Sequence, residues 1–152
     1  MNNRWIFRIK RDKHGKIERY KARLVVKGCA QRKEYDYEET YAPVARMTTL
    51  RVLLAVIVEK NLHASHMDVR NTFLHGDIEK EIYMKVSAGF ETKNNLVCKL
   101  NKALYGLKQA PRAWNKTFTN FITGLGFRRS EIDKCVYFTD RRNLHIYPLI
   151  CR

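Results

Sequence analysis

The stretch that decides the fold is WIFRIKRDKHGKIERYKARLVV, residues 5–26. Residues 5–10 alternate apolar with basic side chains, which is typical of a half-buried strand. Residues 11–16 are of turn-forming types and include Gly15, and residues 17–26 return to strand-forming types. We therefore predict a β-hairpin whose basic residues lie on one side.

The sequence after this hairpin predicts helices and strands in irregular order. An acidic, aromatic loop over residues 34–40 is closed by Pro43. The other predicted elements are a helix over 50–60 capped by Thr48 or Thr49 and ended by Asn61, a strand over 62–69, a turn over 74–77, strands over 81–86 and 96–100, a helix over 112–125 begun by Pro111, and a strand pair over 135–138 and 144–147. Because strict βαβ alternation is missing, we expect an α+β domain.

Each predicted helix carries apolar residues at the i, i+3, i+4 spacing that marks a buried face. The expected buried stripes are Leu50, Leu53, Leu54, Ile57 and Val58 in the first helix, and Trp114, Thr117, Phe118, Phe121, Ile122 and Leu125 in the second.

The composition is that of a globular protein, since 45% of the 152 residues are hydrophobic and 30% are charged. No apolar run approaches the roughly 18 residues that span a bilayer, and the first residues lack the apolar core of a signal peptide. We therefore expect a cytoplasmic or nuclear protein without a membrane partner. The four cysteines lie far apart and are expected to be reduced, because their spacing fits neither a zinc site nor a disulfide framework.

The net charge of +15 is unevenly distributed. Residues 1–33 hold 12 basic and 2 acidic residues, so +10 of the total lies in the first fifth of the chain. A block of this kind attracts polyanions, because each neutralised phosphate releases condensed counterions. We interpret it as a nucleic-acid-binding surface, with a solvated surface or an anionic membrane face as the alternatives.

Most catalytic signatures are absent from the sequence, including a P-loop, GxGxxG, GxSxG and HExxH. His63 and His66 are three residues apart in a predicted strand, where their side chains would face opposite ways, so they do not suggest a metal pair. Asp68 closes that strand, at a position where Mg²⁺-dependent nucleotidyl transfer would require a carboxylate. A cap or a solvated turn residue is the alternative interpretation of Asp68.

Four segments in this order resemble one known family. They are KARLVVKG (21–28), DYEETYAPVAR (36–46), MDVRNTFLHG (67–76) and LYGLKQAPR (104–112). Together they resemble the Ty1/copia-type retrotransposon reverse transcriptase, over a region from about Trp5 to Tyr147.

This resemblance implies the fingers and a partial palm of a right-hand polymerase, with a mixed or antiparallel sheet packed on helices. Residues 1–152 would form a single truncated reverse transcriptase domain. Residues of about 5–45 would be the basic fingers hairpin and its loop, and residues of about 46–147 the partial palm with further fingers segments. The implied partners are an RNA or DNA template–primer and a deoxynucleoside triphosphate.

The resemblance also implies roles for single residues. Asp68 matches the first palm aspartate, a catalytic residue and Mg²⁺ ligand, and the Val69 backbone would lie at the metal or the triphosphate. Phe73 matches a steric gate against a ribose 2′-hydroxyl, although a plain core phenylalanine is the alternative. The other candidates are Lys10, Lys21 and Arg23 for the phosphates of the nucleotide, Tyr105 and Gly106 for the nucleotide pocket, and Lys108 and Arg112 for template–primer phosphates.

The sequence departs from the family at two places. After Asp-Val the family usually has Lys-Thr-Ala-Phe and then Asn before Gly, where this chain has Arg70-Asn71-Thr72-Phe73 and His75-Gly76. The family also carries a Tyr-x-Asp-Asp hairpin, and this sequence contains no Asp-Asp pair. One carboxylate cannot hold two Mg²⁺ ions against their hydration, so the ancestral metal site is expected to be incomplete.

We therefore expect a fragment of an RNA-directed DNA polymerase whose ancestral chemistry is nucleotidyl transfer with two Mg²⁺, and which is inactive as it stands. A non-catalytic basic nucleic-acid-binding remnant and a pseudogene product are the alternatives.

Overall fold

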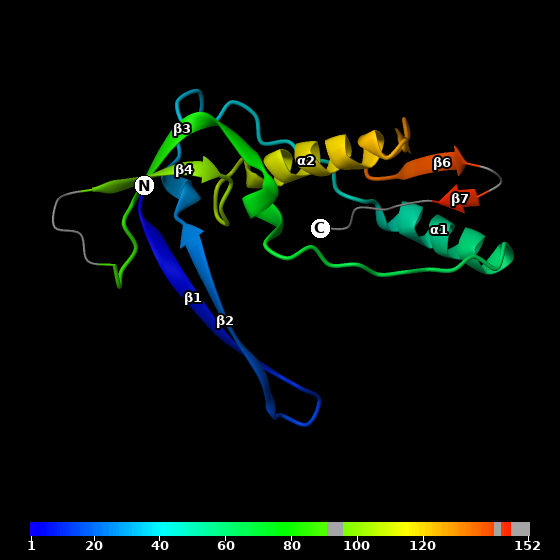
Figure 1. The fold of residues 1–152 in the computed structure, drawn as a ribbon, viewed down its shortest axis with the longest axis horizontal. Coiled ribbons are helices and arrows are strands. Elements are labelled where there is room, and N and C mark those ends of the chain that lie inside the picture. The colour runs from blue at the N-terminus through cyan, green and yellow to red at the C-terminus, as the bar shows by residue number, and fades with distance from the viewer. Residues whose placement is uncertain (91–95, 142–143, 147–152) are drawn as a thin grey trace. The chain divides into compact units, whose positions relative to one another are not determined.

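The fold is that of a computed structural model, which describes residues 1–90, 96–141 and 144–146. Its elements are the strands β1 (Asn3–Arg11), β2 (Ile17–Val26), β3 (Asp77–Lys85), β4 (Val97–Lys102), β5 (Arg128–Arg129), β6 (Tyr137–Arg141) and β7 (Leu144–Ile146), the helices α1 (Met47–Glu59) and α2 (Ala110–Gly124), and the 3₁₀ turns η1 (Gly28–Ala30) and η2 (Thr72–His75) (Figure 1). The strands of the described region form three separate antiparallel sheets, of order β1-β2, β3-β4 and β5-β6-β7. Mixed helices and strands are thus confirmed, but the strands form several small sheets where one was expected.

The chain forms two compact units, each made of two segments. The first unit comprises residues 1–41 and 71–114, and the second comprises residues 42–70 and 115–152.

The predicted hairpin is confirmed and dominates the first unit, where β1 and β2 run side by side as the long blue ribbon of Figure 1. Directly opposed residues of an antiparallel pair share a face, so the register sorts the side chains. One face carries Arg4, Arg8, Lys10, Arg19, Lys21 and Arg23, which we call the basic face, and the other carries Trp5, Phe7, Ile9, Tyr20, Ala22 and Leu24. At the tip, Asp12 Oδ1 accepts the backbone N–H groups of His14 and Lys16 at 2.8 and 3.0 Å.

The core of the first unit lies where β2 meets β3 and the start of α2. Its buried members are Val26, Ile82, Met84, Ala103, Leu107 and Ala110. Ile82 and Met84 alternate with exposed residues along β3, which confirms the period of two predicted for residues 81–86.

The second unit has a small core around Tyr137, whose side chain is fully buried. Phe118 of α2 meets the Tyr137 ring edge-on at 5.8 Å between centroids, and the Thr119 hydroxyl lies 2.8 Å from the Tyr137 hydroxyl. Ile122 and Cys135 are also buried there. Aromatic packing from α2 is therefore confirmed for the amino-terminal part of its predicted stripe.

The strand predicted over residues 62–69 is wrong, because these residues form neither helix nor strand and only Leu62 among them is partly buried. A strand gains its stability from pairing with a neighbour, and apolar alternation alone does not supply that neighbour. The strand predicted over residues 144–147 is described as β7 (Leu144–Ile146), and Tyr147 lies outside the described residues.

The start of α1 was also predicted wrongly, whereas its end was predicted correctly. The helix begins at Met47 with no side-chain cap from Arg46, and Thr49 Oγ1 donates instead to Asp133 Oδ2 at 2.7 Å. Asn61 takes the left-handed conformation at φ +48°, and the N–H groups of Asn61 and Leu62 donate to the carbonyls of Val58 and Ile57. This is the Schellman arrangement that an Asn after a helix favours.

Both buried stripes are narrower than predicted. Leu54, Val58, Phe121 and Leu125 are exposed, at 50%, 81%, 62% and 47%. Each helix therefore buries only part of its predicted stripe. Neither helix in the described part of the chain is long and apolar enough to cross a membrane.

Candidate functional site

Three segments of the first unit bring their side chains together around Tyr105. The guanidinium of Arg23, on the basic face of β2, lies 4.8 Å from the centroid of the Tyr105 ring. The Phe73 ring, from η2, meets the same ring at 4.6 Å and 65° in an edge arrangement. All three side chains are partly buried, and we call this group the Tyr105 cluster. Cation–π and edge-to-face geometry both favour such an arrangement.

The backbone of β2 holds Tyr105 by its carbonyl group. The Val26 N–H donates to the Tyr105 carbonyl oxygen at 2.8 Å. Gly106 has φ +96°, and a Cβ on it would overlap the Val26 carbonyl oxygen, while a Cβ on Gly28 would overlap the Gly106 carbonyl oxygen. Only glycine fits where two backbone segments cross this closely. Gly28 and Gly106 therefore let the turn of residues 104–109 lie directly on the end of β2.

A buried glutamine joins this turn to the loop after η1. Gln31 is 4% exposed. Its Oε1 accepts the Lys108 backbone N–H at 2.7 Å, and its Nε2 donates to Gln109 Oε1 at 2.9 Å. Gln109 Nε2 donates in turn to the Asp36 carbonyl at 3.0 Å. Reasoning from sequence missed Gln31, because no periodicity or spacing marks a residue whose partners lie far along the chain.

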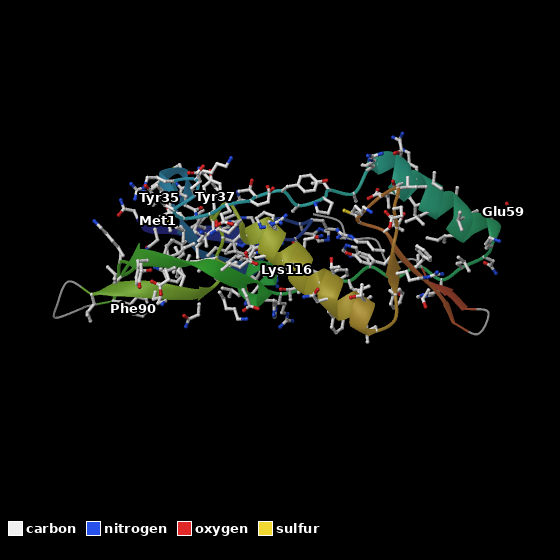
Figure 2. The ribbon with its side chains drawn as sticks, turned by 90° about the horizontal axis from the view of Figure 1, so that it is seen from above. Met1, Tyr35, Tyr37, Glu59, Phe90 and Lys116 are labelled. Carbon is white, nitrogen blue, oxygen red and sulfur yellow. The ribbon has the colours of Figure 1, made fainter. Side chains whose placement is uncertain are left out.

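Lys108 and Arg112, the candidates for template–primer phosphates, have partners within the unit. Lys108 Nζ donates to the Gln31 carbonyl at 3.1 Å and to the Tyr37 hydroxyl at 3.3 Å. Tyr37 is labelled in Figure 2 beside Tyr35, on the segment between η1 and α1. Arg112 Nη1 donates to the Tyr41 carbonyl at 3.2 Å. Both cations therefore hold residues 31–41 against the start of α2.

Glu39 carries a local negative charge in that loop. The backbone N–H groups of Tyr41 and Thr40 donate to Glu39 Oε1 and hold the pKa of this carboxyl below its usual range, and the charges of Arg112 and Lys33 act in the same direction.

The remaining candidates are not members of the Tyr105 cluster. Lys10 is exposed near the tip of the hairpin opposite Arg19, and Lys21 is partly buried opposite Arg8. Asp68 and Val69 belong to the second unit, in the irregular segment 62–69, and both are exposed.

The described residues do not fit a pair of magnesium ions. Among them, no group of three or more His, Cys, Asp or Glu side chains is placed to hold a metal ion. A divalent cation bound by oxygen ligands needs several of them in fixed positions, and Asp68 supplies one carboxylate.

The sequence matches a known protein family over almost its whole length. A family described as "Reverse transcriptase (RNA-dependent DNA polymerase)" matches residues 1–147. The chain belongs to this reverse transcriptase family. The match confirms the family that the four sequence segments predicted, and it covers both the Tyr105 cluster and Asp68.

Several curated relatives show which branch of the reverse transcriptases this is. The chain is 47% identical over 137 residues to the retrovirus-related Pol polyprotein from transposon TNT 1-94 of Nicotiana tabacum, covering 89% of the chain and 10% of the relative. It is 44% identical over 149 residues to the Pol polyprotein from transposon RE1 of Arabidopsis thaliana, covering 97% and 10%. The Ty1-BL Gag-Pol polyprotein of Saccharomyces cerevisiae is 28% identical over 155 residues, covering 92% and 8%.

These relatives confirm the predicted Ty1/copia-type branch. The chain spans about a tenth of the length of the curated relatives it matches. No solved structure matches this reverse transcriptase chain significantly.

Proposed function

We propose that this chain supplies the nucleotide-gripping part of an RNA-directed DNA polymerase of a copia-like retrotransposon, within a longer Pol polyprotein. In this proposal residues of about 5–45 are fingers, and residues of about 46–147 are partial palm with further fingers segments. The observation that carries it is the Tyr105 cluster, because Arg23, Phe73 and Tyr105 come from three separate segments and meet in one place beside a basic strand face.

Each member of the cluster has a chemistry that suits a deoxynucleoside triphosphate. A guanidinium binds phosphate oxygens through two parallel N–H donors, so Arg23 would bind the triphosphate. Lys10 and Lys21, further along the basic face, would contact its phosphates as well. An aromatic ring packed edge-on against another has a fixed position, so Phe73 can exclude a ribose 2′-hydroxyl sterically. Tyr105 and Gly106 would line the pocket for the base and sugar.

Asp68 and Val69 would belong to the reaction centre of the complete polymerase, where Mg²⁺ assists nucleotidyl transfer. The proposal for this chain rests on its sequence, which contains no Asp-Asp pair to accompany Asp68. We therefore propose that residues 1–152 on their own bind nucleotide and template–primer without extending the primer.

Primer extension tests this proposal. The chain is incubated with an RNA template, a labelled DNA primer, Mg²⁺ and the four deoxynucleoside triphosphates, beside Asp68→Ala. Both proteins should leave the primer unextended. Extension by the natural chain that disappears in Asp68→Ala would contradict the proposed inactivity and show that Asp68 works with ligands supplied by this chain.

The second candidate is a non-catalytic nucleic-acid-binding protein that uses the hairpin alone. It is favoured by the six cations that share the basic face, because a row of this kind neutralises phosphates whatever the sequence. The two candidates differ at the Tyr105 cluster, since the hairpin alone needs no nucleotide pocket. Binding of a single nucleotide at that cluster therefore separates them.

A further inference from the structure

We propose that Gln31 is a positioning residue whose buried side chain fixes the turn of residues 104–109 and thereby holds the Tyr105 ring between Arg23 and Phe73. The inference rests on the proposed function in one respect only, namely that the Tyr105 cluster receives the nucleotide.

The first argument is how the Gln31 amide is used. The side chain is almost completely buried, and a buried amide must be hydrogen-bonded to be tolerated. Both of its ends have partners in the 104–109 segment, since Oε1 accepts from the Lys108 N–H and Nε2 donates to Gln109 Oε1. Gln31 thus connects two parts of the chain that are 77 residues apart.

The second argument is that the Lys108 N–H of the turn takes its acceptor from Gln31. Inside the turn the Leu107 N–H donates to the Leu104 carbonyl at 3.2 Å, whereas the Lys108 N–H donates to Gln31. Gly106 at φ +96° sits between the two attachment points of the turn, which are the Tyr105 carbonyl on Val26 and the Lys108 N–H on Gln31. A glycine does not hold its own conformation, so both attachment points are needed to fix the residue that precedes it.

A purely structural role for Gln31 would act through a different branch of the network. Gln109 Nε2 holds the Asp36 carbonyl, and through it Gln31 could simply stabilise the loop of residues 31–41. The two roles separate in a pair of matched variants. Gln31→Leu removes the acceptor for the Lys108 N–H. Gln109→Leu removes the bond to the Asp36 carbonyl and also the acceptor of Gln31 Nε2, but it leaves the acceptor for the Lys108 N–H in place.

The experiment uses the full chain and its aromatic NMR signals. Without any nucleotide, the ring signals of Phe73 and Tyr105 report their mutual position. Gln31→Leu should move both toward the values of free rings. It should also weaken binding of dGTP, added with Mg²⁺, by about tenfold, the loss expected when the ring occupies its binding position only about a tenth of the time. Gln109→Leu should keep the ring signals at their natural positions and the affinity for dGTP within about twofold. Gln31→Glu retains an acceptor for the Lys108 N–H, so it should return the ring signals toward their natural positions and the affinity to within about threefold.

Wild-type ring positions in a folded Gln31→Leu protein would overturn the proposal, and so would a Gln109→Leu protein with the same changes as Gln31→Leu. If Gln31→Leu does not fold, hydrogen exchange of the Lys108 amide in the unmodified chain decides. A protected amide supports the proposal, and exchange as fast as in an open turn overturns it. Failure of dGTP to bind the natural chain would instead refute the proposed function, because the ring signals are read without nucleotide.

Discussion

At the scale of single residues, Asp133 supplies the start of α1 with the acceptor that the helix itself lacks. It is 6% exposed, and its Oδ2 accepts the Thr49 hydroxyl at 2.7 Å and the Arg46 N–H at 3.4 Å. Its Oδ1 accepts the Cys135 N–H at 2.9 Å. Burial raises the pKa of this carboxyl, but the hydrogen bonds from Thr49, Cys135 and Arg46 and the charge of Arg46 outweigh it, so the pKa lies below its ordinary value.

We predict that Asp133→Asn lowers the free energy of unfolding by about 2 kcal/mol at pH 7, because an amide nitrogen would replace an acceptor facing buried donors. The folded pKa is depressed, so this stability is complete above the unfolded pKa of about 3.9 and is lost as the pH falls through the folded pKa. Urea titrations of both proteins should therefore differ at pH 7 and converge at the lowest pH at which the chain still folds.

The control for this prediction is Glu131→Gln in the same loop. Glu131 is paired with Lys134 at the surface, so this variant should unfold like the natural chain at every pH. A difference between Asp133→Asn and the natural chain that stays constant with pH would contradict the role of the ionised carboxylate.

Two glycines with nearly the same φ angle separate backbone strain from steric overlap. Gly106 has φ +96° and Gly89 has φ +94°. A Cβ on Gly106 would overlap the Val26 carbonyl oxygen, whereas a Cβ on Gly89 would meet no atom of residues 1–90, 96–141 and 144–146 within 4 Å. Gly89→Ala should cost about 1–2 kcal/mol of unfolding free energy for the backbone alone. Gly106→Ala should cost about 2–3 kcal/mol more in urea titration. Equal losses of unfolding free energy in the two variants would show that the backbone at Gly106 does not lie against the Val26 carbonyl.

The sequence motifs pointed to Arg23, Phe73, Tyr105 and Gly106 as site residues, and the structure places these four in one unit around a shared ring. Gln31 and Asp133 could not be found in this way. Their partners lie 77 and 84 residues away, and a local pattern contains no information about which distant donor a buried side chain will meet.

At the scale of elements, the basic face of the hairpin is a direct consequence of period-two alternation, because the register places Arg8 opposite Lys21 and Lys10 opposite Arg19. Template–primer binding should therefore be strongly salt-dependent. Replacing Arg8, Lys10 and Arg19 together by alanine should reduce the slope of log affinity against log salt by about 2–3, since each phosphate contact contributes about 0.7–0.9.

The opposite face of the hairpin provides the control for salt dependence. Phe7 and Tyr20 are 73% and 74% exposed on that face. Phe7→Ser with Tyr20→Ser should leave the salt slope unchanged in fluorescence anisotropy, because no charge is removed. An unchanged slope in the triple alanine variant would mean that the phosphates are bound elsewhere.

The accuracy of the predicted elements depended on whether their cause was local. The hairpin, β3, β4 and the end of α1 at Asn61 follow from residues inside or next to the element, and all were predicted. The strand over 62–69 and the cap of α1 were predicted wrongly, because a strand needs a partner and this helix takes its acceptor from Asp133. Local signals cannot supply either.

At the scale of the whole molecule, the two units divide the predicted roles between them. The first unit holds the hairpin and the Tyr105 cluster, and the second holds Asp68 and Val69. Since the chain spans about a tenth of its curated relatives, polymerisation is proposed for the longer protein, and binding for this chain. The central claim is that nucleotide binds at the Tyr105 cluster of the first unit.

The most direct test is a titration of the full chain with dGTP and Mg²⁺, followed by the aromatic NMR signals of Phe73 and Tyr105. The matched control is Arg32, whose guanidinium lies 4.8 Å from the Tyr35 ring, the same distance as in the Arg23–Tyr105 pair. We predict that dGTP shifts the two cluster signals, that Arg23→Ala weakens binding at least about tenfold, and that Arg32→Ala leaves it unchanged. Saturable dGTP binding that leaves both rings unshifted, or that is equally strong in Arg23→Ala, would contradict the account.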